Sequence, residues 1–296
     1  MPSKITVILS KDRNPGAHQQ AMHDQLLAGL VGREDVQVAA VPHLYDLAPD
    51  GPSIRYLRAI RGDMVVLAWL YPRSSYWVLQ ANRVDGRFAA TSSLFEEQSE
   101  NGEPEAEERE IDEGRKIWCF DLRAHRRPER YLKQVDRILA RRTAPVAERV
   151  APSVPSEPVT VDEMPSARWY PVVDFSRCTH CGECLNFCLF GVFSVDDQER
   201  IVIEMPDACR PGCPACARIC PSGAIMFPQH ADPAIAGDPE KSLSGLKLDL
   251  SQIFSGAGVA EIAMAERQRA LREKLSQEAA QDGLDDLVNR LDDMEL

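Results

Sequence analysis

The sequence predicts an open α/β sheet of parallel strands, followed by a cysteine-rich α+β domain and C-terminal helices. Three observations lead to this prediction. Residues 1–142 alternate short apolar runs with amphipathic segments, residues 143–167 contain five prolines, and eight of the nine cysteines lie between positions 178 and 220. At 296 residues the chain is long enough for one sizeable core and a smaller second domain.

The first domain, residues 1–142, contains four strand–helix pairs in series. Strands are expected at 4–10, 36–41, 64–71 and 116–122, and helices at 21–32, 52–62, 74–84 and 127–142. Such a series favours a parallel sheet covered by helices, so we expect a flavodoxin-like or Rossmann-like arrangement. Residues 96–113 hold ten acids against one base, and we expect a flexible insertion there, outside the core.

The rest of the chain divides at its prolines and cysteines. Residues 143–167 have little apolar periodicity and are expected to form a semi-extended tether. The cysteine-rich domain is expected at 168–232, and a loop with a helical tail at 233–296. Within that tail an apolar stripe at helical spacing is formed by Leu284, Leu287, Val288 and Leu291.

The charge and hydropathy of the chain exclude several classes of partner. A net charge of -12 argues against nucleic acid, which is itself negatively charged. No stretch approaches the roughly 18 apolar residues of a membrane span, and the apolar run after Lys4 is too short for a signal peptide. We therefore expect a cytoplasmic protein with no direct membrane insertion, whose cysteines serve metal or redox chemistry.

The cysteines form two closely spaced runs. The first has gaps of two, two and three residues, and the second has gaps of three, two and three and is followed by Pro221. Three thiolates on a tight loop can hold three corners of a cubane, which leaves a fourth corner for a ligand from elsewhere. The runs are Cys178, Cys181, Cys184, Cys188 and Cys209, Cys213, Cys216, Cys220.

The stretches CTHCGECLNFC and CRPGCPACARICP resemble the bacterial dicluster ferredoxin family, in which a C-x2-C-x2-C-x3-C-P run occurs twice. The resemblance covers about 60 residues and implies two 4Fe-4S clusters. In the family, the fourth cysteine of each run reaches the other cluster. Carried across, this implies one cluster on Cys178, Cys181, Cys184 and Cys220, and the other on Cys209, Cys213, Cys216 and Cys188.

The sequence departs from the family pattern at two places. Leu189 stands where the family has proline, and the second run has an extra residue within Arg210-Pro211-Gly212. Neither removes a ligand, and Gly212 supplies the backbone freedom that a longer loop requires. The alternative is zinc, since paired C-x2-C motifs also build zinc sites, but three close cysteines with a fourth three residues on favour clusters.

Other residues near the runs are expected to support the ligands. His180 is expected to be a surface or hydrogen-bonding residue and not a ligand, because all four thiolates are present without it. Apolar cover for the ligands is expected from Phe175, Phe187, Phe190, Val192, Phe193, Val195, Ile201, Ile203, Ile219, Ile225 and Phe227.

Residues 1–142 contain neither a G-x-G-x-x-G nor a P-loop motif, so a standard dinucleotide or ATP site has no support. A ligand of an open α/β sheet would lie beyond the carboxyl ends of the strands. Arg13 and Arg73, near helix starts, could bind an anion there. The candidate loops hold Ser10, Lys11, Arg13, Asn14 and Gly16, then His43, then Tyr71, Pro72, Arg73 and Ser74.

A purely structural interpretation of the same loops is also open. In it, Ser74 caps a helix, Asn14 to Gly16 form a turn, and the arginines are solvated. Cys119 is expected to be a buried free thiol. The aromatic residues that could stack on a flat cofactor, but are expected in the core, are Trp69, Tyr71, Tyr76 and Trp77.

The leading hypothesis is a cytoplasmic electron-transfer protein whose first domain docks it to a redox protein partner or complex. The alternative is an oxidoreductase whose first domain binds a flavin or a small substrate supplied with electrons by the clusters, although no motif supports a flavin. A third possibility is a regulatory protein whose clusters sense oxidation. Complete cluster ligation, with no equally clear catalytic constellation, favours the first.

Overall fold

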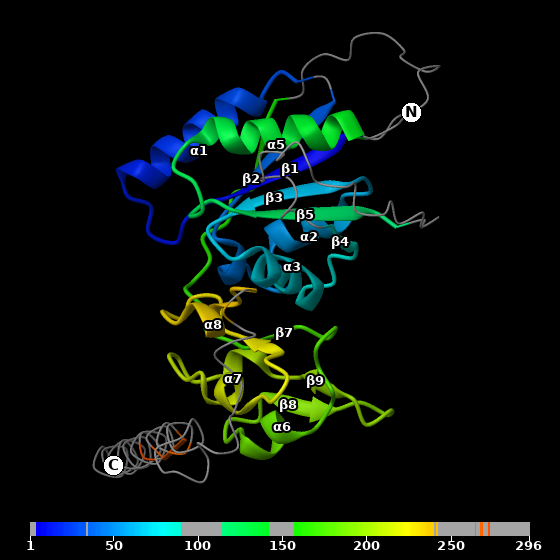
Figure 1. Ribbon diagram of the computed structural model, residues 1–296, viewed down its shortest axis with the longest axis vertical. Helices are drawn as coiled ribbons and strands as arrows, with labels where there is room; N and C mark the ends of the chain where they lie inside the picture. The colour runs from blue at the N-terminus through cyan, green and yellow to red at the C-terminus, as the bar shows by residue number, and fades with distance from the viewer. Residues whose placement is uncertain are drawn as a thin grey trace, which may run out of the picture. The chain divides into compact units, whose positions relative to one another are not determined.

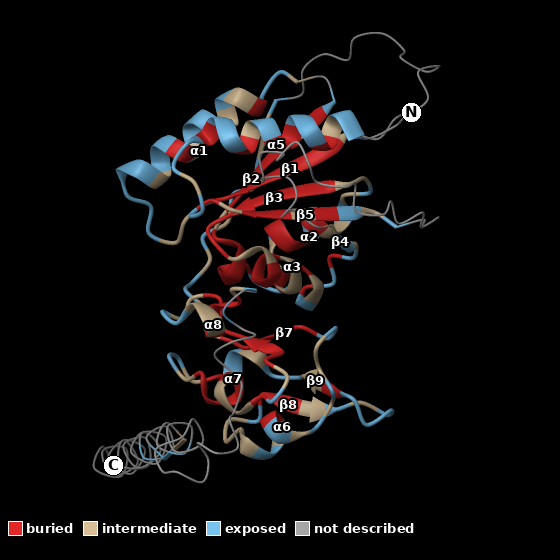
Figure 2. Ribbon diagram, viewed as in Figure 1, coloured by how far each residue is buried: buried red, intermediate tan, exposed pale blue. Residues whose placement is uncertain are grey.

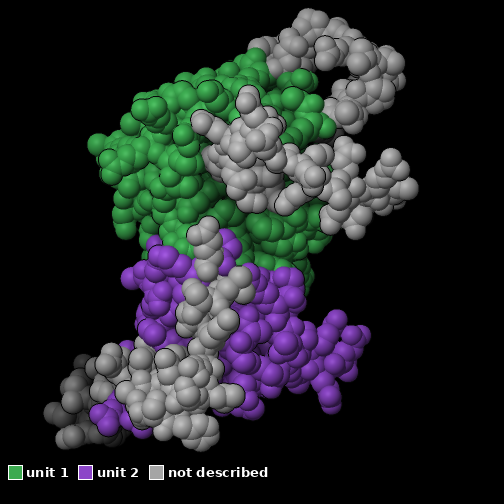
Figure 3. Space-filling model, viewed as in Figure 1, with its two compact units in different colours: residues 1–168, 236–238 green, residues 169–235, 239–296 purple. Residues whose placement is uncertain are grey.

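The structure, a computed structural model, forms two compact units, which Figure 3 shows in different colours. Unit 1 comprises residues 1–168 and 236–238, and unit 2 comprises residues 169–235 and 239–296. The predicted acidic insertion, the start of the predicted tether and the apolar stripe of the tail all lie outside the described residues. The described residues are 4–33, 35–89, 114–141, 157–239, 241, 264, 267, 268 and 272.

Unit 1 is built on a six-stranded sheet in the order β4-β5-β3-β1-β2-β6, in which every pair of neighbours is parallel. The predicted open parallel α/β sheet is therefore confirmed. All six residues of the central strand β1 are buried, because helices cover both faces of the sheet. The strands are β1 (Ile5–Ser10), β2 (Val36–Val41), β3 (Met64–Ala68), β4 (Arg87–Ala89), β5 (Lys116–Asp121) and β6 (Val159–Thr160).

Helices α1 and α5 cover one face of the sheet, and α2 and α3 cover the other (Figure 1). Leu26 of α1 and Tyr131 of α5 pack in the same core cluster as Val7 of β1. The outer sides of α1 and α5 carry exposed residues, whereas strands β1, β2 and β3 are buried along most of their length (Figure 2). The helices are α1 (Ala17–Leu30), α2 (Pro52–Ala59), α3 (Pro72–Ala81) and α5 (Pro128–Arg141), with a short 3₁₀ turn η1 (Leu44–Asp46).

The strand order places a topological switch between β1 and β3. The chain runs from β1 to β2 on one side and then returns to β3 on the other side of β1. The loops that follow β1 and β3 therefore leave neighbouring strands in different directions. Both loops lie at the carboxyl edge of the sheet, where the sequence places the candidate ligand residues.

Two short strands of unit 1 were not predicted. One is β4, and the other is β6, which lies inside the predicted tether and pairs with β2 through Ala39 opposite Val159. The backbone N–H of Val161 also donates to the carbonyl of Ala40 at 3.1 Å. A strand of two or three residues is too short to show an alternating pattern, so its partner in the sheet defines it.

The segment after β6 also holds the start of a helix. Helix α2 begins after Gly51, which has no side chain to cap it. The Glu163 carboxylate instead accepts hydrogen bonds from the backbone N–H groups of Ser53 at 2.9 Å and Ala48 at 3.3 Å. The last residues of the predicted tether therefore pack as part of unit 1.

Unit 2 repeats one order of elements twice: a strand, a cysteine loop, a short helix and another strand. The first strand of one half pairs antiparallel with the last strand of the other, β7 with β10, and the two inner strands, β8 and β9, pair with each other. The elements are β7 (Val172–Val173), α6 (Glu183–Phe187), β8 (Phe193–Val195), β9 (Ile201–Ile203), the 3₁₀ turn η3 (Pro206–Ala208), α7 (Ala215–Ile219) and β10 (Ile225–Met226).

The chain after β10 differs in part from the predicted loop. Residues Pro233–Ala236 form a short helix, α8. The described residues of the tail, 264, 267, 268 and 272, are helical. In the part of the chain that the structure describes, no helix is both long and apolar enough to span a membrane.

Replacing Glu163 tests whether the segment after β6 stabilises unit 1. We expect Glu163→Ala to lower the free energy of unfolding of unit 1 by about 1 kcal/mol, because the Ser53 N–H in the first turn of α2 and the Ala48 N–H lose their acceptor. Glu157→Ala, at an exposed position of the same segment, serves as the control and is expected to change little. Urea denaturation followed by tryptophan fluorescence measures both, and equal stability of the two variants would contradict this role of Glu163.

Candidate functional site

The two cysteine runs occupy equivalent places in the two halves of unit 2. The third cysteine of each run lies within a short helix, Cys184 in α6 and Cys216 in α7. The fourth, Cys188 or Cys220, is the first residue after that helix and has an extended backbone. The short helices α6 and α7 pack together. This packing brings the end of each run toward the other half of the unit.

The first set of neighbouring thiols contains three cysteines of the first run and the last cysteine of the second. The pKa of Cys184 is raised to about 12, first by burial and then by the charges of Cys220, Cys178 and Cys181. The pKa of Cys178 is also raised, first by burial and then by the charges of Cys220 and Cys181. Among these four residues, Cys181 is exposed to solvent.

The second set has the reciprocal composition. Burial raises the pKa of Cys216, and the charges of Cys209, Cys213 and Cys188 add to the effect, followed by that of Cys184. The pKa of Cys209 is likewise raised by burial and then by the charges of Cys213 and Cys188. Each set therefore contains three cysteines of one run and the fourth of the other, and Cys184 and Cys216 bring the two sets close together.

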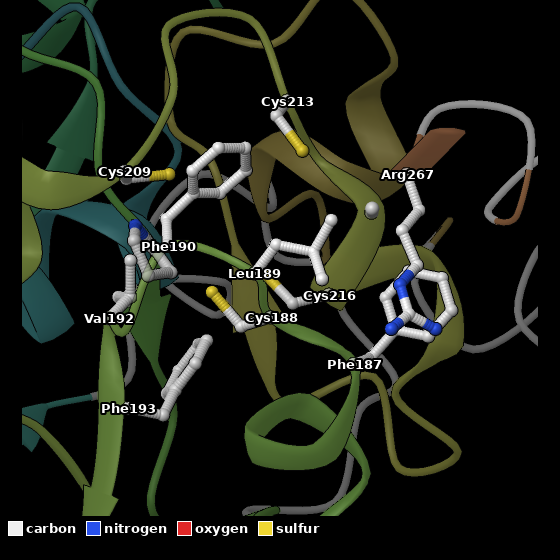
Figure 4. Close-up of a pocket in the computed structure, with 12 residues that line it drawn as sticks. Phe187, Cys188, Leu189, Phe190, Val192, Phe193, Cys209, Cys213, Cys216 and Arg267 are labelled. Carbon is white, nitrogen blue, oxygen red and sulfur yellow. The ribbon is translucent and has the colours of Figure 1, made fainter. Parts of the chain in front are cut away.

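The second set surrounds a cavity. Cys188, Cys209, Cys213 and Cys216 all line it, and Figure 4 shows the sulfur atoms of the first three turned toward the space between them. Leu189, at the position where the ferredoxin pattern has proline, is part of the wall. The other lining residues are Pro171, Phe187, Phe190, Val192, Phe193, Ala215 and Arg267, whose guanidinium lies 5.1 Å from the centre of the Phe187 ring.

The longer loop of the second run closes through a turn. The backbone N–H of Cys213 donates to the carbonyl of Arg210 at 3.1 Å, and Gly212 has a φ of +79°. Residues with a side chain rarely adopt this left-handed backbone conformation, whereas glycine adopts it without strain. Gly212 therefore has the role that the sequence predicts, and the extra residue leaves the cysteines on either side of the loop within one set.

His180 fixes the corresponding loop of the first run. Its Nδ1 accepts a hydrogen bond from the backbone N–H of Ile201 at 3.0 Å and lies 3.8 Å from the Cys178 sulfur. The prediction of a hydrogen-bonding residue is therefore confirmed. The predicted apolar cover is wrong at two positions, since Phe175 and Val195 are 42% and 49% exposed. The Phe175 ring stacks on His180 at the surface of the unit.

The chemistry of the two sets fits a polynuclear metal group. All eight sulfurs belong to free cysteines, and burial disfavours the ionisation of Cys184, Cys209 and Cys216 unless positive charge offsets it. Within the described ranges, no three Cys, His, Asp or Glu side chains lie close enough to hold a single metal ion. Four thiols that surround a space, as Cys188 and its neighbours do, are suited to bind several metal atoms, one thiolate to each.

At the carboxyl edge of the sheet in unit 1, the structure brings Arg13 and His43 together around Asp46. Asp46 is not among the candidate residues identified from the sequence. The buried Asp46 carboxylate accepts hydrogen bonds from Arg13 Nε at 2.7 Å and from the Arg168 N–H at 3.0 Å, and lies 3.2 Å from His43 Nδ1. The only sequence signal is an acid three residues after His43. Ser10 accepts a hydrogen bond from the backbone N–H of Leu44 at 2.9 Å.

Two predictions for the loop after β3 are wrong. Ser74 does not cap a helix, because α3 begins at Pro72 after Tyr71, and the Ser74 hydroxyl donates to the carbonyl of Ala236. Arg73 is not solvated, since it is only 6% exposed. The helix starts earlier than predicted because proline is favoured at the first helical position.

The remaining candidates in the carboxyl-edge loops make local contacts. Lys11 is exposed, Gly16 precedes α1, and the Asn14 N–H donates to the Asp12 carboxylate at 2.9 Å in a tight turn. The guanidinium of Arg123 lies over the ring of Tyr71, 4.2 Å from the centre of that ring. The loops thus come together as predicted, but the charged and hydroxyl groups described above bind other parts of unit 1.

The aromatic candidates and Cys119 behave mainly as structural residues. Trp69 belongs to the buried core, as predicted, whereas Tyr76 and Trp77 are half-buried and contact each other edge-on. Tyr76 also packs on Phe88 of β4. Cys119 is fully buried in β5, its thiol is free and burial raises its pKa, so the predicted buried thiol is confirmed.

Comparison with known proteins finds two similar sequences, both named uncharacterized ferredoxins of Methanocaldococcus jannaschii. The first is 36% identical over 66 residues, which are 22% of this chain and 44% of that protein. The second is 36% identical over 55 residues, 18% of this chain and 86% of that protein. The chain therefore spans less than half of the first relative and most of the second. No protein-family model matches the chain.

The Asp46 network predicts a pH-dependent stability. Burial raises the pKa of Asp46, but hydrogen bonds from His43, Arg13 and the Arg168 backbone outweigh it and hold the pKa at about 2. Because the pKa is lower in the folded chain, this stabilisation is full above about pH 4 and is lost as pH falls through about 2. Asp46→Asn should lower the free energy of unfolding at pH 7 by about 3 kcal/mol.

The matched control is Asp50→Asn, because the Asp50 side chain is 86% exposed although it pairs with Arg58. That variant should stay within about 0.5 kcal/mol of the wild type. Denaturation measured from pH 2 to 7 should show the difference between wild type and Asp46→Asn shrinking as the pH falls. A difference that is constant across this range would contradict the assigned role of Asp46.

Proposed function

The chain belongs to the ferredoxin family, and from this premise we propose that it is an electron-transfer protein that carries two four-iron four-sulfur clusters in unit 2. The observation that supports the proposal most is the division of eight thiols into two sets of four, each completed by the last cysteine of the other run. When bound, such clusters supply reversible one-electron chemistry.

The ligand assignment follows the two sets. We assign Cys178, Cys181, Cys184 and Cys220 to the first cluster. The raised pKa values of the buried thiols support a cationic occupant, because bound iron offsets the cost of burying several thiolates together. The second cluster is assigned to the cavity and to its four lining cysteines, Cys209, Cys213, Cys216 and Cys188.

The residues around each set control exposure and charge. The apolar walls beside Phe190 and Phe193 limit the access of water to the second set, and low solvent access disfavours extra negative charge. The backbone N–H of Ala224 donates to the Cys220 sulfur at 3.3 Å, which acts in the opposite direction by stabilising negative charge on a ligand. The two sets therefore provide different environments for an electron.

Exposure of Cys181 suggests where a partner approaches. It is the exposed member of the first set, and Phe175, which stacks on the adjacent residue His180, is also exposed. We propose that a redox protein partner docks near Cys181 and that an electron passes between the sets where Cys184 and Cys216 are neighbours. Unit 1 is assigned a docking role, because polar groups of its carboxyl-edge loops bind other segments of unit 1 in place of a flavin or substrate.

The cofactor content tests the proposal directly. Protein purified without oxygen should contain about eight iron and eight acid-labile sulfide per chain, because each four-iron four-sulfur cluster contributes four of each. It should contain no stoichiometric zinc. Metal analysis by mass spectrometry, with a colorimetric sulfide assay on the same sample, measures both. Two zinc ions per chain and no sulfide would overturn the proposal.

The crossed assignment predicts which cluster each fourth cysteine supports. Cys220→Ala should damage the cluster of Cys178, Cys181 and Cys184, whereas Cys188→Ala should damage the cluster of the second run. Electron paramagnetic resonance of the reduced variants measures which signal is lost or altered. The control is Cys119→Ala in unit 1, which should retain both signals. If Cys220→Ala altered only the signal of the second run's own cluster, the crossed ligation would be wrong.

A further inference from the structure

Trp169, the first residue of unit 2, contacts the second cysteine run although it is 40 positions or more away in the sequence. Its indole Nε1–H donates a hydrogen bond to the backbone carbonyl of Cys213 at 3.2 Å. The indole also stacks on Phe227, with ring centres 5.2 Å apart and an angle of 20° between the planes. Phe227 is fully buried, so it gives the indole a fixed support.

The loop that Trp169 contacts differs in length from its counterpart in the first run. It runs from Cys209 to Cys213 with one residue more than the corresponding loop of the first run. It contains an internal turn, and the space that a side chain at Gly212 would enter holds no atom within 4 Å. An added loop residue increases the number of conformations available to the chain, so a contact from outside the loop helps to fix its end.

In the first run, a different hydrogen bond restrains the corresponding loop. There the loop from Cys178 to Cys181 has the usual two intervening residues, and His180 within it binds the backbone N–H of Ile201. In the second run, the loop residues Arg210, Pro211 and Gly212 include no histidine. The indole of Trp169 supplies a side-chain hydrogen bond to the backbone at the end of this loop.

We propose that Trp169 is a positioning residue that holds Cys213 in place as a ligand of the second cluster. This inference rests on the proposed function, because it concerns how one ligand of that cluster is held. The hydrogen bond restrains the Cys213 backbone, and the stacking on Phe227 restrains the indole. Supporting groups of this kind orient metal ligands and tune the bound metal. Trp169 therefore acts on the second cluster selectively.

Trp169→Phe is the direct test, since phenylalanine retains an aromatic ring beside Phe227 but lacks the N–H donor. The full-length protein, prepared without oxygen, is compared with the wild type and with Trp118→Phe, the same change in unit 1. Three quantities are measured: the reduction potential of each cluster, its electron paramagnetic resonance signal, and the rate at which iron is lost to a chelator. The cluster of Cys178 serves as an internal reference.

In Trp169→Phe, the iron of the second cluster, half of the total, should be released to the chelator about fivefold faster than in the wild type. This factor corresponds to the loss of one hydrogen bond of ordinary strength. The potential and signal of the second cluster should change, while those of the first cluster and of Trp118→Phe should match the wild type. The inference is overturned if both clusters of Trp169→Phe match the wild type, or if both change equally, as general destabilisation of unit 2 would cause. Absence of iron and sulfide from the wild type would instead refute the proposed function.

Discussion

The structure of unit 2 depends on the cost of burying several thiols close together. Burial raises the pKa of Cys184, Cys209 and Cys216, and each also lies near the charge of other cysteines. Such a core favours neutral thiols until positive charge enters it, and bound metal supplies that charge. The described strands and helices of this unit are only two to five residues long, so metal binding and folding are expected to be coupled.

Unit 1 also buries a charged group, which its own side chains and backbone stabilise. Its buried carboxylate, Asp46, is surrounded by Arg13, His43 and the Arg168 backbone. A buried charge is tolerated only when it is paired and hydrogen-bonded, and here the partners come from the loop after β1, the loop after β2 and the segment after β6. The groups that could have formed a ligand site at this edge therefore hold the chain's own segments together.

The sequence predicted the larger elements of unit 1 well because each shows a clear apolar run or a helical pattern. Strands β1, β2 and β3 and helix α5 lie close to their predicted positions, since buried parallel strands give continuous apolar runs. It did not predict β6, whose two residues become a strand only by pairing with β2. It also placed Phe175 and Val195 in the apolar cover, because apolar character alone does not say which face of a short element is buried.

The sequence by itself determined the donor chemistry: eight cysteines at cluster spacing, with Gly212 where the longer loop needs a left-handed backbone. Spacing is a local property, so these features can be recognised without the fold. Tertiary structure decided which side chains support the site, because contacts between distant residues depend on how the elements pack. Trp169 forms its hydrogen bond with Cys213, and Asp46 with Arg168, only after the chain has folded.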